Sequence, residues 1–213
     1  MVRARNGGAA LSQVRLPHVE PGQRVGLFGG SFNPPHEAHL LVSEIALKRL
    51  RLDQIWWLVT PGNPLKMGVE TPSLDERMAA CRVMTTDRRI VIAGFERELG
   101  TRYTASTLAF LKRRHSRTHF VWVMGADCLG QFHHWRRWRS IFEMMPVAVV
   151  DRPTYHLKAL ASPAARTFQL SKIDETQARG LAGMPPPAWT FLTGPLSAQS
   201  STRLRVLRAR DVQ

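Results

Sequence analysis

The sequence predicts an α/β fold built on a doubly wound parallel sheet, with helices on both faces. Short apolar runs of β type alternate with segments of helical period along most of the chain. The apolar runs are not interrupted by polar residues, which is typical of strands that are buried on both faces. Parallel strands of this kind are joined by right-handed helical crossovers, and ligands bind beyond their carboxyl ends.

The elements follow this alternation in order. The β-type runs predict strands over 25–28, 55–60, 90–93, 118–124, 147–150 and 189–193. The helix-period segments predict helices over 38–50, 74–86 and 104–114, a further one around 138–144, and a short basic one that starts at Ser200. Asp151-Arg152-Pro153 ends the fifth strand, because proline cannot continue the ladder.

Length and composition favour one main domain. The 213 residues and 44% apolar content suffice for a full core. We expect a flexible extension over residues 1–23, a single domain over 24–213, and a small helical subdomain within it from about 154 to 213. Residues 185–187 are consecutive prolines that form a stiff connection into the last strand. The sequence shows no internal repeat.

Charge and cysteine content narrow the class of protein. The formal net charge is +14, so a polyanionic partner has to be considered, although arginine is scattered along the whole chain and such charge also serves solubility. Cys81 and Cys128 have no CxxC spacing and are interpreted as ordinary thiols in a reducing compartment. No stretch has the length of a secretory signal or a membrane span, which predicts a cytoplasmic protein without a membrane partner.

The most informative segment joins the first strand to the first helix. It runs from Gly30 through Ser31 and Phe32 to His36 and His39, and together with Gly29 it shows the pattern GxxxxPxH. Glycine lets the backbone approach a ligand closely, and the amides of a first helical turn attract negative charge. Two histidines three residues apart share one helical face. The alternative is a glycine-rich turn that only closes a tight connection, but GxGxxG and a Walker lysine are both absent.

Such imidazoles can donate hydrogen bonds to phosphate and stabilise charge as a nucleotide's α-phosphoryl group is attacked. His36 and His39 are therefore the predicted catalytic residues, without acting as nucleophiles. The expected reaction is a direct in-line displacement, with Mg²⁺ or another divalent cation bound mainly through the phosphates of ATP. No carboxylate cluster identifies protein ligands for that cation.

The segment Gly29-Gly30-Ser31-Phe32-Asn33-Pro34-Pro35-His36-Glu37-Ala38-His39 resembles the motif GG(S/T)FxPxHxGH of bacterial nicotinate mononucleotide adenylyltransferases, in the nucleotidyltransferase superfamily. The resemblance covers roughly residues 24–210 and implies a Rossmann-like sheet. It also implies that Gly29, Gly30, Ser31 and Phe32 bind ATP. Ala38 replaces the usual glycine, while both histidines are intact.

A second motif of this family, ISSTxIR, resembles residues 199–205. Ser200, Ser201 and Thr202 can cap a helix whose amides face phosphate, and Arg205 follows as a cationic donor. The alternative is a plain helix N-cap. The resemblance favours a second clamp on the triphosphate of ATP, although Gln199 replaces the usual aliphatic residue.

The resemblance assigns the remaining site residues. Gly125 and Asp127 follow the fourth strand and are expected to contact the adenosine of ATP, with an N-cap as the alternative for Asp127. For the acceptor, the expected contacts are Asn63 and Lys66 near its phosphate, Tyr103 and Thr104 near its pyridine carboxylate, and Trp135 stacked on its ring. Trp135 lies in an arginine-rich segment, where a packing anchor is the alternative.

These residues predict transfer of the adenylyl group of ATP to nicotinate mononucleotide, which yields deamido-NAD and pyrophosphate. Transfer to nicotinamide mononucleotide or phosphopantetheine is the nearest alternative. A basic nucleic-acid-binding module is a rival from another class, but only residues 133–139 combine arginines with interleaved aromatics. We therefore expect no nucleic-acid partner. The sequence carries no prediction of the oligomeric state.

Overall fold

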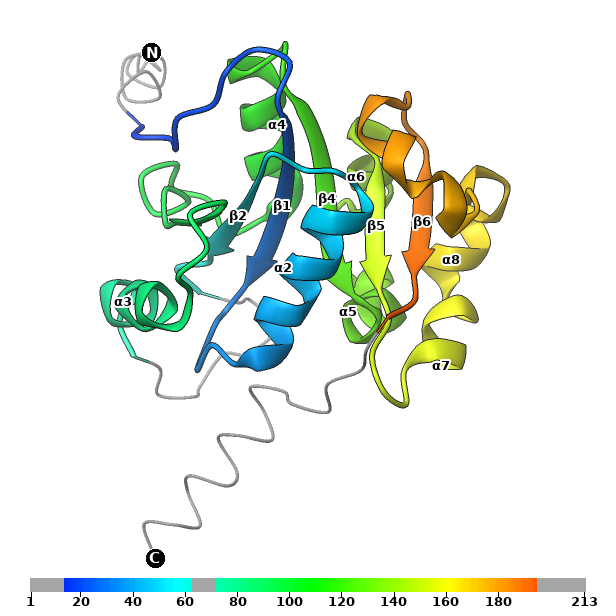
Figure 1. Ribbon diagram of the computed structural model, residues 1–213, viewed down its shortest axis with the longest axis horizontal. Coiled ribbons are helices and arrows are strands. Elements are labelled where there is room, and N and C mark those ends of the chain that lie inside the picture. The colour runs from blue at the N-terminus through cyan, green and yellow to red at the C-terminus, as the bar shows by residue number, and fades with distance from the viewer. Residues whose placement is uncertain (1–13, 63–71, 195–213) are drawn as a thin grey trace, which may run out of the picture.

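The computed structural model describes residues 14–62 and 72–194, and its centre is a parallel sheet (Figure 1). The strands are β1 (Arg24–Gly30), β2 (Gln54–Val59), β3 (Ile90–Ala93), β4 (His119–Gly125), β5 (Val147–Val150) and β6 (Trp189–Leu192). All neighbouring pairs are parallel, in the order β3-β2-β1-β4-β5-β6. The doubly wound α/β prediction is confirmed, and so is each predicted strand to within two residues at either end.

Helices cover both faces of this sheet. The α-helices are α2 (Glu37–Arg49), α3 (Leu74–Met84), α4 (Thr104–Arg114), α5 (Ala126–Gln131), α6 (Trp138–Met144), α7 (His156–Leu160) and α8 (Pro163–Thr167). The 3₁₀ segments are η2 (Phe132–His134), η3 (Gln169–Ser171) and η4 (Glu175–Gly183). In Figure 1, α2 crosses the near face, and α4 and α6 lie behind the sheet.

Two apolar clusters fill the spaces between sheet and helices. One contains Trp56 and Trp122 and packs against α4, α5 and α6, while the other contains Trp57 and packs against α2, α3 and η4. Because successive residues of a strand face opposite sides, Trp56 and Trp57 serve different clusters. This explains why the strands appear as uninterrupted apolar runs in the sequence.

The described part of the leader packs on the domain. Val14, Leu16 and Val19 are partly buried against the cluster that contains Trp122, and the Gly22 N–H donates to the Arg117 carbonyl at 2.7 Å. Residues 14–23 are therefore in contact with the fold. At the other end of the chain, β6 pairs with β5 and extends the main sheet. Among the described residues, no helix has the length and apolar character needed to cross a membrane.

Helix α3 has a well-defined start that matters for the site. Its N-cap Ser73 accepts a hydrogen bond from the Glu76 N–H at 3.2 Å, and the Glu76 carboxylate accepts one from the Ser73 N–H at 2.7 Å. This reciprocal pair satisfies two amides of the helix terminus. It fixes the residue at which α3 begins, and Arg77 follows Glu76 in the first turns of the helix.

Gly29 of β1 is required by the packing of a neighbouring ring. A Cβ atom at this position would lie 2.6 Å from the buried Trp122 ring. We expect Gly29→Ala to lower the free energy of unfolding by about 1–3 kcal/mol, as measured by urea denaturation. Gly130 of α5 is the matched control, because a Cβ there meets nothing within 4 Å. Gly130→Ala should be neutral or stabilising by up to about 1 kcal/mol, and equal destabilisation by both would contradict this explanation.

Candidate active site

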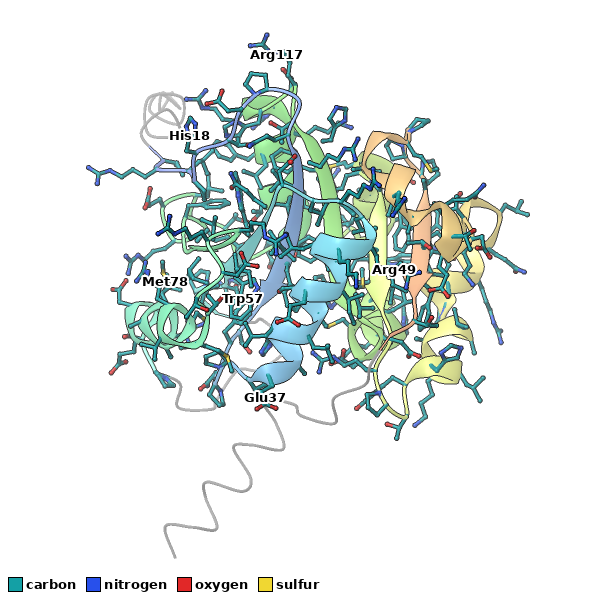
Figure 2. All side chains as sticks on the ribbon, in the orientation of Figure 1. His18, Glu37, Arg49, Trp57, Met78 and Arg117 are labelled. Carbon is teal, nitrogen blue, oxygen red and sulfur yellow. The ribbon has the colours of Figure 1, made fainter. Side chains whose placement is uncertain are left out.

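The site lies at the connection between β1 and α2, at the edge of the sheet formed by the carboxyl ends of the strands. Figure 2 labels Glu37, the first residue of α2, at this edge and Arg117 at the opposite edge. The sheet reverses its winding direction between β1 and β4, because β2 and β3 extend to one side and β4, β5 and β6 to the other. A crevice at such a switch point is where open α/β sheets bind ligands.

His36 and His39 meet at the N-terminus of α2, as the sequence predicts. His36 is the N-cap residue, and the two ring centroids lie 3.8 Å apart. The His36 N–H donates to Nδ1 of His39 at 3.1 Å, and the His39 N–H donates to the His36 carbonyl at 2.8 Å. Since Nδ1 of His39 accepts a hydrogen bond, the proton of its neutral ring lies on Nε2. His39 therefore has one N–H to offer a ligand.

Both imidazoles are held in the neutral form. Burial, together with the positive charge of Arg152, lowers the pKa of His36 to about 4. Burial lowers the pKa of His39 well below its usual value, and the charges of His36 and Arg152 act in the same direction. Near neutral pH these rings are uncharged hydrogen-bond donors, and the fixed positive charge of the site comes from Arg152.

The low pKa of His36 makes stability depend on pH. Between pH 6.5 and about 4 the unfolded chain binds more protons than the folded one, so the free energy of unfolding should fall as the pH is lowered through this window. Urea denaturation at a series of pH values measures this slope. His36→Gln should make the slope shallower than in the native protein. An identical slope in both proteins would contradict the depressed pKa.

An aromatic cluster holds the loop before α2. Phe32 is fully buried with φ at 45°, and its ring stacks on Trp57 with centroids 4.8 Å apart and contacts His39 at 4.7 Å. The Trp57 indole N–H donates to the Ser43 hydroxyl at 2.7 Å, which donates to the His39 carbonyl at 2.8 Å. Any contact of Phe32 with ATP must therefore use its backbone. The cluster fixes the first turn of α2.

Gly125, Asp127 and Arg152 lie together where β4 and β5 end, at the same edge of the sheet as the histidine pair. Gly125 is the N-cap of α5, and Asp127 lies in the first turn of that helix, so the alternative that Asp127 is itself the N-cap is wrong. The Arg152 Nε lies 3.3 Å from Oδ1 of Asp127. A Cβ on Gly125 would come within 2.8 Å of Arg152 Nε, which explains the glycine. A carboxylate and a buried guanidinium thus lie side by side at this edge of the sheet.

Tyr103, Thr104 and Trp135, which are predicted to contact the acceptor, lie on two neighbouring segments. Tyr103 is the N-cap of α4 and Thr104 is its first residue. Trp135 ends η2 rather than lying within an arginine-rich helix, and it packs edge-on against Trp122 with centroids 6.2 Å apart. The guanidinium of Arg136 lies 4.6 Å above the Tyr103 ring and links the two segments. Packing and ligand contact are both compatible with Trp135, which is only partly buried.

The remaining predicted residues lie outside the described part of the chain. These are Asn63 and Lys66 on the acceptor side, and Ser200, Ser201, Thr202 and Arg205 of the second motif. Their roles stay predictions.

Two buried arginines near the site have no place in the sequence prediction. Arg152 is 9% exposed and acts on both histidines, and Arg77 is 6% exposed and bonds to the loop before α2. In the sequence, Arg152 only marks the end of a strand and Arg77 is one of many helical arginines. The signal that could have identified Arg152 is its position directly after a strand, at the ligand-binding edge of the sheet.

The chemistry available at this edge is anion recognition without a nucleophile. Uncharged imidazoles, the N-terminus of α2 with its helix dipole and a buried guanidinium together favour the binding of phosphate and stabilise charge that develops on it. The fold and the site define a nucleotidyltransferase, and residues 27–206 match the cytidylyltransferase-like family. A relative from Methylorubrum extorquens strain PA1, named "Probable nicotinate-nucleotide adenylyltransferase", is 60% identical and covers 85% of this chain and 98% of its own. The chain belongs to the nicotinate-nucleotide adenylyltransferase family.

Further comparisons agree. A relative of the same name from Rhizobium johnstonii is 54% identical over 89% of this chain and 96% of its own. The solved structure of Plasmodium falciparum nicotinic acid mononucleotide adenylyltransferase complexed with NaAD has a TM-score of 0.64, covering 86% of this chain and 83% of that one. At 16% identity, this likeness confirms the Rossmann-like fold.

Proposed function

We propose that this enzyme transfers the adenylyl group of ATP to nicotinate mononucleotide, releasing pyrophosphate and forming deamido-NAD. The single observation that carries the proposal is the pair of neutral imidazoles at the N-terminus of α2, with Arg152 close enough to lower the pKa of both rings. Support for the pyridine acceptor comes from the family and from Tyr103 and Trp135, which lie on neighbouring segments.

In this mechanism the protein positions the reactants and stabilises charge. The Nε2–H of His39 donates to an oxygen of the α-phosphoryl group as negative charge accumulates there. Amides at the start of α2 and the guanidinium of Arg152 hold the phosphates, and Asp127 accepts hydrogen bonds from adenosine. The acceptor phosphate attacks in line and pyrophosphate leaves, so no covalent enzyme intermediate forms.

We infer that a divalent cation reaches this site together with the nucleotide. Among the described residues, no three His, Cys, Asp or Glu side chains lie together as a metal site. Mg²⁺ is commonly held by substrate phosphates with few protein ligands, and it neutralises charge on them. We propose that it enters with ATP. We also propose a cytoplasmic enzyme, because a chain of this length with only two cysteines and no CxxC spacing is typical of a reducing compartment.

The test is pyrophosphate release from ATP with nicotinate mononucleotide, nicotinamide mononucleotide or phosphopantetheine as the acceptor. The proposal expects the nicotinate compound to give the highest kcat/KM. Higher values with either of the other acceptors would reassign the substrate. Salt-dependent retention on nucleic acid, with no turnover of ATP under any acceptor, would favour a binding protein instead.

A further inference from the structure

Arg77 is buried between the two loops that leave β1 and β2. Its Nη1 donates to the Ser31 carbonyl at 2.7 Å and to the Thr60 carbonyl at 2.9 Å, and its Nε donates to the Pro72 carbonyl at 3.1 Å. Within the described ranges no carboxylate forms an ion pair with it. One guanidinium on α3 thus holds carbonyls from three separate segments.

The same loop is held at the preceding peptide. The Gly30 carbonyl accepts a hydrogen bond from the Thr60 N–H at 3.1 Å. Two successive peptide groups, Gly30–Ser31 and Ser31–Phe32, are therefore fixed through their oxygens by Thr60 and Arg77. Because a trans peptide is planar, its N–H points away from its carbonyl. The N–H groups of Ser31 and Phe32 consequently point away from Arg77 and from the loop after β2.

These two amides are available to a ligand. In the part of the chain that the structure describes, neither the Ser31 N–H nor the Phe32 N–H donates to another backbone group. Phe32 adopts a positive φ of 45°, which is costly for a bulky residue and persists only where the surroundings enforce it. The stack on Trp57 and the bond to Arg77 supply that enforcement from opposite ends of the residue.

In the described part of the chain, the charge of Arg77 is offset by carbonyl oxygens and by no carboxylate. A buried ion without a carboxylate partner is expensive, and apolar residues of similar volume usually pack as well. The buried charge of Arg77 becomes favourable when a polyanion binds nearby. A guanidinium is also suited to this position because its forked donors can reach several carbonyls at once.

We propose that Arg77 is a positioning residue, whose hydrogen bonds to Ser31 and Thr60 aim the Ser31 and Phe32 amides at a phosphate group of the nucleotide. The inference deepens the proposed function and rests on it. We assign Arg77 a positioning role rather than a catalytic one, because its Nη1 and Nε groups are directed to the three carbonyls. Arg77 also links Thr60, after β2, to Ser31 in the segment proposed to bind ATP.

The first test compares Arg77→Lys and Arg77→Gln with Arg82→Gln, an exposed arginine of the same helix. We expect kcat to fall about 100-fold in Arg77→Gln and about tenfold in Arg77→Lys, with the KM for nicotinate mononucleotide within about threefold of native. Near-UV circular dichroism and urea denaturation check each fold. If Arg77→Gln does not fold, Arg77→Lys carries the test, because it keeps the charge in the same space. Values of kcat within about twofold of Arg82→Gln in the folded variants would overturn the proposal.

The second test compares phosphate binding by the native protein and the variants, and it does not depend on turnover. Inorganic tripolyphosphate is added to the ¹⁵N-labelled protein, and the amide resonances of Ser31 and Phe32 should shift in the native protein and in Arg82→Gln, but less in Arg77→Lys. Unmoved resonances in the native protein would overturn the proposal. If no acceptor supports pyrophosphate release by the native enzyme while these shifts occur, the proposed reaction fails and the positioning role stands.

Discussion

Replacement of His39 by alanine is expected to lower kcat by about 100- to 1,000-fold while the KM for ATP changes by less than about threefold. The reason is that the Nε2–H of His39 is a preorganised donor whose hydrogen bond strengthens as charge builds up on the α-phosphoryl group. A contact that counts mainly in the transition state appears in kcat rather than in KM. Initial rates of pyrophosphate release at varied ATP measure both constants.

His119 provides the matched control for this substitution. It is exposed at the first position of β4, at the opposite edge of the sheet from the crevice. His119→Ala should keep kcat within about twofold of native. A rise in the KM for ATP with an unchanged kcat in His39→Ala would show that His39 binds the ground state and the transition state equally.

Replacement of Arg152 by glutamine is expected to reduce activity about as strongly as His39→Ala does. Here the reduction should appear in kcat/KM for ATP rather than in kcat alone. Arg152 is the buried cation of the crevice, so its loss should lower kcat/KM for ATP by about 100-fold. The same substitution removes a charge that lowers the pKa of His36, and this pKa should therefore rise. An NMR titration of the imidazole resonances measures that shift independently of turnover.

Arg97→Gln is the control for Arg152→Gln. Arg97 also pairs with a carboxylate, that of Asp75 at 3.1 Å, but the pair is exposed. Its loss should leave both kcat/KM and the His36 titration close to native. If Arg152→Gln leaves the His36 titration unchanged, then Arg152 does not act on the histidine pair. A normal kcat/KM for ATP would exclude Arg152 as a phosphate ligand.

The fold could be predicted from the sequence because its strands are buried on both faces. The apolar runs of β1 and β2 form a strong local pattern. The sequence also predicts β6, although this strand follows a long segment with a weak pattern. The short helices α5, α7 and α8 were not predicted as elements. They have five or six residues, too few for a helical period to emerge, and packing on the sheet stabilises them.

The site could be predicted only where its residues are close in sequence. His36 and His39 form a local motif, and the structure places them in contact. The bond from Arg77 to Ser31 joins residues 46 positions apart, and the pairing of Arg152 with Asp127 depends on how β4 and β5 align. Nothing in a local pattern distinguishes these arginines from the many solvated ones of a chain with net charge +14.

The neutral imidazoles described above imply that nucleotide binding is coupled to proton uptake. A triphosphate placed beside His36 and His39 favours their cationic forms and raises the pKa of each ring. At a pH close to those raised pKa values the complex takes up protons from solution as it forms, and in that range the histidines favour tighter binding of ATP as the medium becomes more acidic. In that pH range the heat of binding varies with the ionisation enthalpy of the buffer, because the buffer releases the protons that the two rings take up.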